Sequence, residues 1–243
     1  MKTHTPPIWA ILPVKSFRNA KQRLSSALTP SERRKLMHNS LWDVLTALGQ
    51  SSRLAGILMV SRDPDALAMG REFGVRLSAI DADAGQSDAI DRAVRFLRSE
   101  GVTATLTIPA DAPLVMARDI DSVCDTLGKA PAVTIVPNME GTGSNCIGAS
   151  PPDLIPYQFG DNSFAMHVSS AHKACVEPRI LELPRLELDI DTTGDIARLM
   201  DYEPRTATQK YILESGILER CMTARPEALL PVARQRDAPL GAR

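Results

Sequence analysis

The chain has 243 residues, of which 44% are hydrophobic, and a formal net charge of −1. That length suffices for one α/β domain with a substantial core, while the balanced charge and the aromatic content of 4% argue against a dedicated nucleic-acid-binding protein. No apolar run approaches the ~18 residues of a membrane span, and the N-terminus lacks the apolar core of a signal peptide. The four cysteines form no CxxC pair, as expected for reduced thiols. We therefore expect a soluble cytoplasmic protein without nucleic-acid or membrane partners.

Short apolar runs alternate with segments of helical periodicity through the first 136 residues. The runs expected to form strands are 8–14, 56–60, 76–80, 106–108 and 132–136. The expected helices lie between them and start near residues 30, 64, 88 and 120. Strands that alternate with helices in this way predict βαβ units, and therefore an α/β fold with a mostly parallel sheet covered by helices on both faces.

Polar residues placed just before the expected helices predict their N-caps. Thr29 and Glu32 form a capping box around Pro30, and proline suits the first helical position. The other expected N-caps are Asp63, Ser87, Ser163 and Thr193. Each cap predicts where a helix begins and therefore where the preceding loop ends.

The alternation of strands and helices breaks at a small polar loop, residues 141–145. The elements expected beyond this loop are strands at 179–183 and 186–190 and helices at 193–200 and 207–218. From residue 223 the chain loses its periodicity and collects Pro, Arg and Gly. We therefore expect one domain over residues 1–221 and a disordered tail over residues 222–243.

Three aspartates are the strongest candidates for chemistry. Asp111 directly follows the expected strand at 106–108, where open α/β sheets bind their ligands. Asp189 and Asp191 are two residues apart in an extended run, so their side chains point to the same side. Together the three carboxylates would form an oxygen site for Mg²⁺. A turn residue and a solvated edge strand would explain the same residues without any metal.

A basic loop follows the first expected strand. Lys15, Lys21 and Arg23 lie where a doubly wound sheet usually receives the phosphates of a nucleotide, although an ordinary solvated loop has the same composition. The motifs GxxxxGK[ST] and GxGxxG are both absent from the chain. Their absence argues against a P-loop NTPase and against a nicotinamide-dependent dehydrogenase.

Two loops of small residues, 141–145 and 159–163, are candidates for binding an anion. Glycine lets the backbone approach an anion closely, and a helix starting at Ser163 would present N–H groups to it. The hydroxyls of Ser144 and Ser163 would add donors, although plain turns explain either loop. His167 and His172 are five residues apart and do not share a helix face, so we expect satisfied or exposed histidines and not metal ligands.

The order and spacing of these motifs resemble the CofC/FbiD family of guanylyltransferases, from about residue 8 to residue 218. The matching segments are Leu12-Pro-Val-Lys15 with Ala20-Lys21-Gln-Arg23-Leu24, Pro109-Ala-Asp111-x-Pro113-Leu114, Gly141-Thr-Gly-Ser-Asn145, Phe159-Gly160-x-x-Ser163 with His167, and Leu188-Asp189-Ile-Asp191-Thr192. These enzymes act on small phosphorylated three-carbon acids in the biosynthesis of coenzyme F-420. The resemblance implies a single-domain, Rossmann-like fold of the nucleotide-diphospho-sugar transferase type. It also implies GTP as co-substrate, Mg²⁺ as cofactor and a homodimer.

The resemblance also implies roles for particular residues. The implied metal ligands are Asp111, Asp189 and Asp191, the implied catalytic residues are Lys15 and Asp111, the implied nucleotide contacts are Lys15, Lys21, Arg23, Gly85 and Ser87, and the implied acid-substrate contacts are Ser144, Gly160 and Ser163. The expected reaction is in-line attack of the acid's phosphate oxygen on the α-phosphorus of GTP, with release of pyrophosphate.

The chain departs from the family at Gly85-Gln86-Ser87-Asp88, where members often have Gly-Leu-Asn before the helix. The acceptor therefore stays open among 2-phospho-L-lactate, phosphoenolpyruvate and 3-phospho-D-glycerate. Three other functions also fit the residues: a glycosyltransferase with a DxD motif at Asp189 and Asp191, a nucleotidyltransferase that uses CTP or a molybdopterin or sugar acceptor, and a non-catalytic nucleotide-binding regulator.

Overall fold

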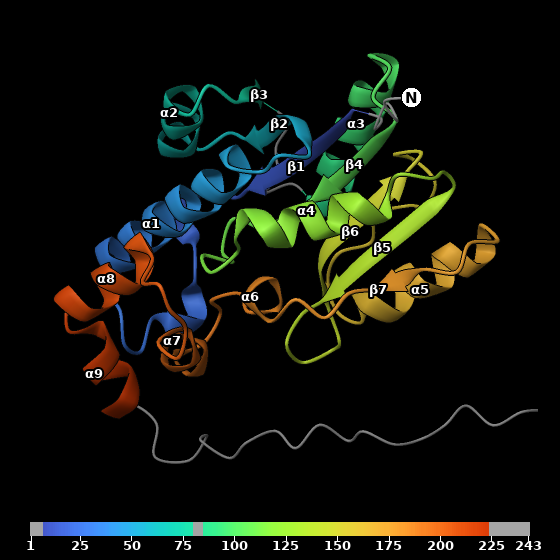
Figure 1. Ribbon diagram of the computed structural model, residues 1–243. Coiled ribbons are helices and arrows are strands. Elements are labelled where there is room, and N and C mark those ends of the chain that lie inside the picture. The colour runs from blue at the N-terminus through green and yellow to red at the C-terminus, as the bar shows by residue number, and fades with distance from the viewer. Residues whose placement is uncertain (1–6, 80–84, 224–243) are drawn as a thin grey trace, which may run out of the picture.

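The computed structural model describes residues 7–79 and 85–223, whose centre is one seven-stranded sheet in the order β3-β2-β1-β4-β6-β5-β7 (Figure 1). The strands are β1 (Ile8–Val14), β2 (Leu54–Ser61), β3 (Arg76–Ser78), β4 (Ala104–Thr107), β5 (Ala132–Pro137), β6 (Ser144–Ser150) and β7 (Arg179–Ile180). Strand β6 pairs antiparallel with β4 and β5, and the other pairs are parallel. The predicted α/β fold with a mostly parallel sheet is confirmed. Residue 80, the expected end of the third strand, lies outside the described residues.

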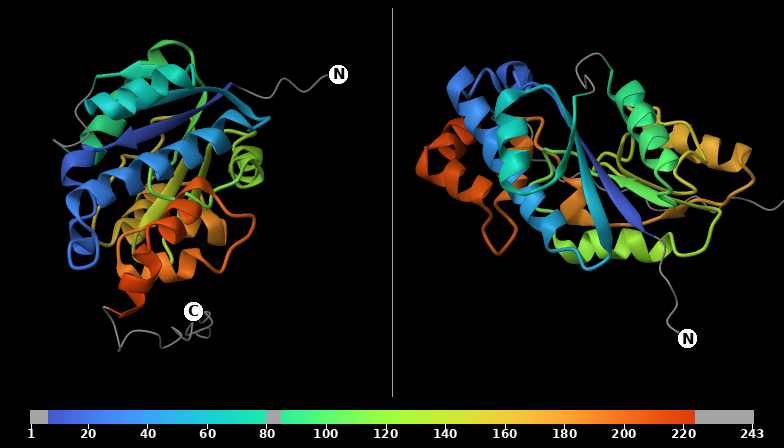
Figure 2. Two further views of the ribbon diagram at one scale, coloured as in Figure 1. Left: turned by 90° about the vertical axis from the view of Figure 1, so that its left-hand side faces the viewer. Right: turned by 90° about the horizontal axis from the view of Figure 1, so that it is seen from above.

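Helices cover both faces of this sheet, as predicted (Figures 1 and 2). Helices α1 (Pro30–Gly49), α2 (Pro64–Glu72) and α4 (Ala117–Thr126) pack on one face, and α3 (Gln86–Ser99) and α5 (Ser163–Lys173) pack on the other. A hydrophobic core lies on each face of the sheet. The apolar strand β1 contributes Ala10 and Leu12 to the core under α1, α2 and α4, and Ile11 to the core under α3 and α5. A strand buried on both faces needs this continuous apolar sequence, because successive side chains alternate between the faces.

The carboxyl ends of β1 and β4 lie side by side at one edge of the sheet. The two strands pair in parallel with Ile11 opposite Thr107, and the Ile108 N–H donates to the Ile11 carbonyl over 3.1 Å. Strand β1 is also where the strand order reverses direction, since β2 lies on its other side. Crevices at such switch points are the usual ligand sites of open α/β sheets.

The basic loop after β1 is ordered by a third apolar cluster. Two short 3₁₀ helices, η1 (Phe17–Asn19) and η2 (Gln22–Leu24), lie in this loop, and Leu24 is fully buried. It packs with residues of α1 and of the C-terminal helices α7 (Thr193–Leu199), α8 (Ala207–Glu214) and α9 (Ile217–Thr223). Arg33 of α1 also donates hydrogen bonds to the carbonyls of Ala20 (3.2 Å) and Leu28 (2.9 Å). The loop is therefore held at both ends and in its middle.

The predicted N-caps at Thr29 and Asp63 are confirmed. Thr29 Oγ1 accepts from the Glu32 N–H (3.3 Å), and the Glu32 carboxylate accepts from the Thr29 N–H (2.8 Å). The predicted cap at Thr193 is wrong by one residue, since Thr192 caps α7 in a capping box with Asp195.

The predicted caps at Ser87 and Ser163 are also wrong, because both hydroxyls have partners on distant segments. Helix α3 is preceded by Gly85, and Ser87 Oγ accepts from the Phe159 N–H (2.9 Å). Helix α5 is preceded by Asn162, whose φ of 57° is left-handed, and Ser163 Oγ accepts from the Ser144 N–H (3.0 Å). Neither helix has a side-chain cap at its N-terminus.

The predicted strand at 186–190 is wrong, because α6 (Pro184–Glu187) occupies its first half. Proline suits the first turn of a helix, and α6 begins at Pro184. Of the strand expected at 179–183, only the two residues of β7 pair with the sheet. The following residues are extended, and the Ile190 N–H donates to the Asp111 carbonyl (3.1 Å). The helix expected at 207–218 is divided into α8 and α9 at Gly216, which has a left-handed φ of 66°.

Most of the predicted tail lies outside the described residues. No helix in the described part of the chain is long and apolar enough to cross a membrane.

Candidate active site

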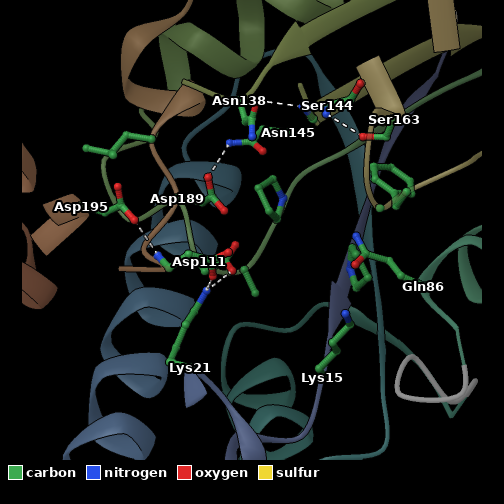
Figure 3. A pocket seen from close by; sticks show the side chains of 18 of the residues that line it. Lys15, Lys21, Gln86, Asp111, Asn138, Ser144, Asn145, Ser163, Asp189 and Asp195 are labelled. Carbon is green, nitrogen blue, oxygen red and sulfur yellow. Dashed lines mark hydrogen bonds and ion pairs between the residues drawn. The ribbon is translucent and has the colours of Figure 1, made fainter. Parts of the chain in front are cut away.

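A cavity of about 850 Å³ opens where β1 and β4 end and reaches the start of β6 and of α5 (Figure 3). Nine of the predicted site residues line it: Lys15, Lys21, Arg23, Asp111, Ser144, Gly160, Ser163, Asp189 and Asp191. Gly85 and Ser87 are not among its lining residues, whereas Gln86 between them is. The fold thus brings together side chains from the loop after β1, the turn after β4, the segment between α6 and α7, and the β6–α5 region.

The three aspartates meet on one side of this cavity. One carboxylate oxygen from each of Asp111, Asp189 and Asp191 lies within 4.8 Å of the others. Burial, together with the nearby negative charges of Asp111 and Asp191, raises the pKa of Asp189 to about 7. Three carboxylates crowded in this way need positive charge beside them, and oxygen ligands of this kind suit Mg²⁺. The donor set therefore fits the predicted metal.

Lys21 places a buried ammonium group between Asp111 and Asp191, and Figure 3 shows its side chain pointing toward Asp111. Its Nζ lies 2.5 Å from Asp111 Oδ2 and 2.8 Å from Asp191 Oδ1, and its side chain is 7% exposed. Burial by itself lowers the pKa of Lys21, but the charges and hydrogen bonds of Asp111 and Asp191 outweigh burial and raise it. Lys21 is therefore a fixed positive charge, and the loop backbone presents it from a left-handed conformation with φ of 54°. Its predicted contact with a triphosphate stays a prediction.

Lys15 and Arg23 supply exposed positive charge at the rim. Arg23 Nη1 lies 3.6 Å from Asp191 Oδ2, and the Arg23 side chain is 75% exposed. Burial raises the pKa of Asp191, but the charges of Lys21, Arg23 and Lys15 outweigh it and lower this pKa. Asp191 is therefore ionised at neutral pH, and the exposed cations can turn toward an anionic ligand.

Two residues that hold the aspartates in place were missed from the sequence. Asn145 Nδ2 lies 3.0 Å from the carbonyls of Leu186 and Glu187 and 3.2 Å from Asp189 Oδ1. Asp195 Oδ2 accepts from the N–H groups of Asp191 (3.1 Å) and Thr192 (2.7 Å). Asp195 carried a usable signal, since a Thr followed three residues later by an Asp fits a capping box. Asn145 lies in the segment 141–145 that resembles the family, but no role was predicted for it.

Asp63, a predicted N-cap, has a second role, because it caps α2 and also fixes the loop after β1. Its Oδ1 accepts from the Asp65 N–H (3.0 Å), and its Oδ2 accepts from the Phe17 N–H (2.9 Å). Asp63 therefore ties the carboxyl end of β2 to the loop that carries Lys15.

We expect Asp63→Ala to lower the free energy of unfolding by about 1–3 kcal/mol, since it removes a cap and leaves the buried Phe17 N–H without its partner. Urea denaturation measures this change. Asp65→Ala is the matched control, because Asp65 pairs with Arg34 at the surface and such pairs contribute under about 1 kcal/mol. Equal stability losses in the two variants would contradict the role of Asp63 in holding the loop.

The other side of the cavity carries hydroxyl groups. Ser144 and Ser163 line it from β6 and α5, and the uncapped N-terminus of α5 lies beside them. His167, one turn further along α5, is fully buried and lies 3.0 Å from Ser144 Oγ through its Nδ1. His167 is thus a satisfied histidine and His172 a half-exposed one, as expected. Hydroxyls and a helix N-terminus together favour an anionic ligand.

Comparison with known proteins agrees with this geometry. The model of a family described as "Guanylyl transferase CofC like" matches residues 8–227. A phosphoenolpyruvate guanylyltransferase of Rubrobacter xylanophilus is 33% identical over 82% of this chain and 99% of that protein. A second, from Conexibacter woesei, is 34% identical over 79% of this chain and 87% of that protein. A 2-phospho-L-lactate guanylyltransferase of Methanothermobacter thermautotrophicus is 29% identical over 84% of this chain and 88% of that protein.

Solved structures confirm the predicted fold type. A crystal structure from Desulfovibrio desulfuricans G20, assigned as a nucleotide-diphospho-sugar transferase, superposes with a TM-score of 0.70. The match covers 88% of this chain and 97% of that one, at 16% sequence identity. At that identity the likeness shows the fold alone.

Proposed function

Because this chain belongs to the family of CofC-like guanylyl transferases, which are nucleotidyltransferases, we propose that it joins GMP from GTP to the phosphate of a small phosphorylated three-carbon acid. Pyrophosphate is the second product, and the reaction is a step in coenzyme F-420 biosynthesis. The observation that carries the proposal is one cavity with two chemically different sides. Three aspartates and Lys21 lie on one side, and the hydroxyls of Ser144 at the start of β6 and Ser163 at the start of α5 lie on the other.

Phosphoenolpyruvate is the acceptor that we propose. Five relatives named for phosphoenolpyruvate are 31–34% identical to this chain and a sixth is 27% identical, whereas two relatives named for 2-phospho-L-lactate are 29% and 27% identical. Gln86, which lines the cavity where family members often have Gly-Leu-Asn, is the residue at which acceptor or nucleotide selection is expected to differ.

The proposed reaction needs little general acid–base catalysis from the protein. A phosphate monoester is largely dianionic at pH 7, since its second pKa is about 6, so its oxygen attacks the α-phosphorus without a strong general base. The main obstacle is bringing two anions together in line. Lys15 and Arg23 at the rim supply positive charge for this purpose, and Lys21 holds Asp111 and Asp191 in a fixed geometry.

Asp111, Asp189 and Asp191 would hold the Mg²⁺, since they supply three clustered oxygen ligands. When bound, this ion offsets negative charge on the phosphate oxygens. Gly160, Ser144 and Ser163 would receive the phosphate and carboxylate of the acid, and Lys15, Lys21 and Arg23 are the proposed nucleotide contacts. The nucleotide contacts predicted at Gly85 and Ser87, which do not line the cavity, stay a prediction. Well-held reactants gain on the order of 7–11 kcal/mol from positioning, which is a large part of the rate enhancement required.

Incubation with GTP, Mg²⁺ and each of the three acids in turn, with pyrophosphate as the readout, tests the proposal. CTP in place of GTP distinguishes other nucleotidyltransferases, and release of a nucleoside diphosphate would indicate a glycosyltransferase instead. No pyrophosphate with any of the acids would overturn the proposed reaction. The homodimer is a further proposal, which light scattering on the purified protein tests.

We expect Ser163→Ala to raise KM for the acid about tenfold or more with little change in KM for GTP. A hydrogen bond to a charged group contributes about 1.5–3 kcal/mol, and 1.4 kcal/mol corresponds to a tenfold change. Steady-state kinetics with each substrate varied in turn measures both constants. Ser169→Ala, on the exposed side of the same helix, is the control. A rise in KM for GTP instead would show that the two sides of the cavity have been assigned in reverse.

A further inference from the structure

His167 is held in a single tautomer by the backbone around it. The Gln158 N–H donates to His167 Nε2 over 3.0 Å, so Nε2 carries no hydrogen. A neutral imidazole carries one hydrogen on its two ring nitrogens, and this hydrogen must then be on Nδ1. Full burial disfavours the charged ring and lowers the pKa of His167 to about 4, so the neutral form is present at physiological pH.

This tautomer determines how Ser144 presents its hydroxyl. Nδ1 of His167 lies 3.0 Å from Ser144 Oγ and, because it carries the hydrogen, it donates and cannot accept. The hydroxyl hydrogen of Ser144 is therefore not used on His167 and is available to a ligand in the cavity that Ser144 lines. The opposite tautomer would take that hydrogen and leave only oxygen lone pairs facing the ligand, which repel an anion.

The neighbouring hydroxyl is arranged in the same way. Ser163 Oγ accepts from the Ser144 N–H over 3.0 Å with one of its two lone pairs, and this bond does not use the hydroxyl hydrogen, which can turn toward a ligand in the cavity. The ring of His167 also packs edge-on against Phe159, with 5.3 Å between ring centroids, beside Gly160. The imidazole of α5 thus contacts both β6 and the 158–160 segment. These three elements enclose this side of the cavity.

We propose that His167 is a positioning residue for the acceptor, which keeps the Ser144 hydroxyl as a hydrogen-bond donor to an anionic group of the acid. This inference rests on the proposed function, and it specifies the kind of group that binds here. Two hydroxyls held as hydrogen-bond donors favour a group that only accepts, such as a phosphate or carboxylate. His167 itself lies behind Ser144 and acts through that residue.

A double-mutant cycle with Ser144 tests this assignment. His167→Gln moves the amide to the position of Nε2 and removes the donor to Ser144, so we expect KM for the acid to rise about tenfold while KM for GTP stays within about twofold. In a Ser144→Ala background, His167→Gln should add less than about twofold. His172→Gln on the same helix is the control and should match the wild type, since His172 is half exposed and pairs with Glu177.

Two results would overturn the proposal. One is the full tenfold loss from His167→Gln in the Ser144→Ala background, and the other is an equal rise in KM for the acid and for GTP. If His167→Gln does not fold, His167→Asn replaces it in the test, because the Asn amide can donate from the position of Nδ1. A KM for the acid within about threefold of the wild type then supports the proposal. A tenfold rise overturns it. A wild-type protein that turns over none of the acids overturns the proposed function, and this inference with it, whereas additive losses in an active enzyme overturn this inference alone.

Discussion

Asp111→Asn is expected to reduce kcat/KM by about a thousandfold or more while the protein stays folded. The substitution keeps the size of the side chain but removes a negative charge that lies within 4.8 Å of Asp189 and Asp191 and pairs with Lys21. A bound metal ion contributes several kcal/mol of charge stabilisation, and each 1.36 kcal/mol corresponds to a factor of ten in rate. Lys21 retains Asp191 as a partner, so the fold is expected to survive.

Pyrophosphate release measured against Mg²⁺ concentration, together with a thermal melt, separates loss of function from loss of fold. Asp201→Asn is the control, because Asp201 is exposed and lies outside the cavity. If Asp111→Asn retained wild-type activity with the same Mg²⁺ dependence, Asp111 would no longer belong to the proposed metal site.

The fold was predictable because its signals are local. Strand β1 is apolar along its whole length, as a strand buried on both faces must be. The capping box at Thr29 begins α1 where expected, because both hydrogen-bonding partners lie within four residues of each other. Where the partner lies far along the chain, as for Ser87 and Ser163, local rules assigned the hydroxyl to the wrong donor.

The clustering of the three aspartates was predictable although one element around them was not. Asp111 was found from its position after a buried strand, and the pair Asp189 and Asp191 from the alternation of side chains along an extended backbone. That alternation does not require a sheet partner, so the pair still faces one cavity even though the segment is not a strand.

The ion pairs of Lys21 could not be predicted from local signals, because its partners lie far along the chain. Asp111 is 90 positions from Lys21, and Asp191 is 170 positions from it. A basic loop after β1 predicts positive charge at the rim, and Lys15 and Arg23 match that expectation. The burial of Leu24 and the hydrogen bonds of Arg33 and Asp63 draw this loop inward, and these long-range contacts have no local signature in the sequence. Other tertiary contacts, to Gln158 and Ser144, carry the role proposed for His167, which the sequence alone described as a satisfied or exposed histidine.

Lys21→Met is expected to lower the free energy of unfolding by about 2–4 kcal/mol in the absence of divalent cations. Removing one partner of a buried ion pair costs about 3–5 kcal/mol, and the exposure of Asp111 (25%) and Asp191 (46%) places the expected loss toward the lower end. Urea denaturation in EDTA measures it. Lys35→Met, at an exposed position of α1, is the control and should change stability by less than about 0.5 kcal/mol.

The same variant tests whether Lys21 and Mg²⁺ share the carboxylates. A ligand that binds only the folded state stabilises it in proportion to the logarithm of its concentration over Kd. In the wild type, Lys21 already neutralises part of the charge on Asp111 and Asp191, whereas in Lys21→Met the three carboxylates have lost that cation. Mg²⁺ should therefore raise the melting temperature of Lys21→Met more than that of the wild type. Equal shifts in the two proteins would mean that the ion and the ammonium group do not act on the same aspartates, and Lys21 would then hold the loop without tuning the metal site.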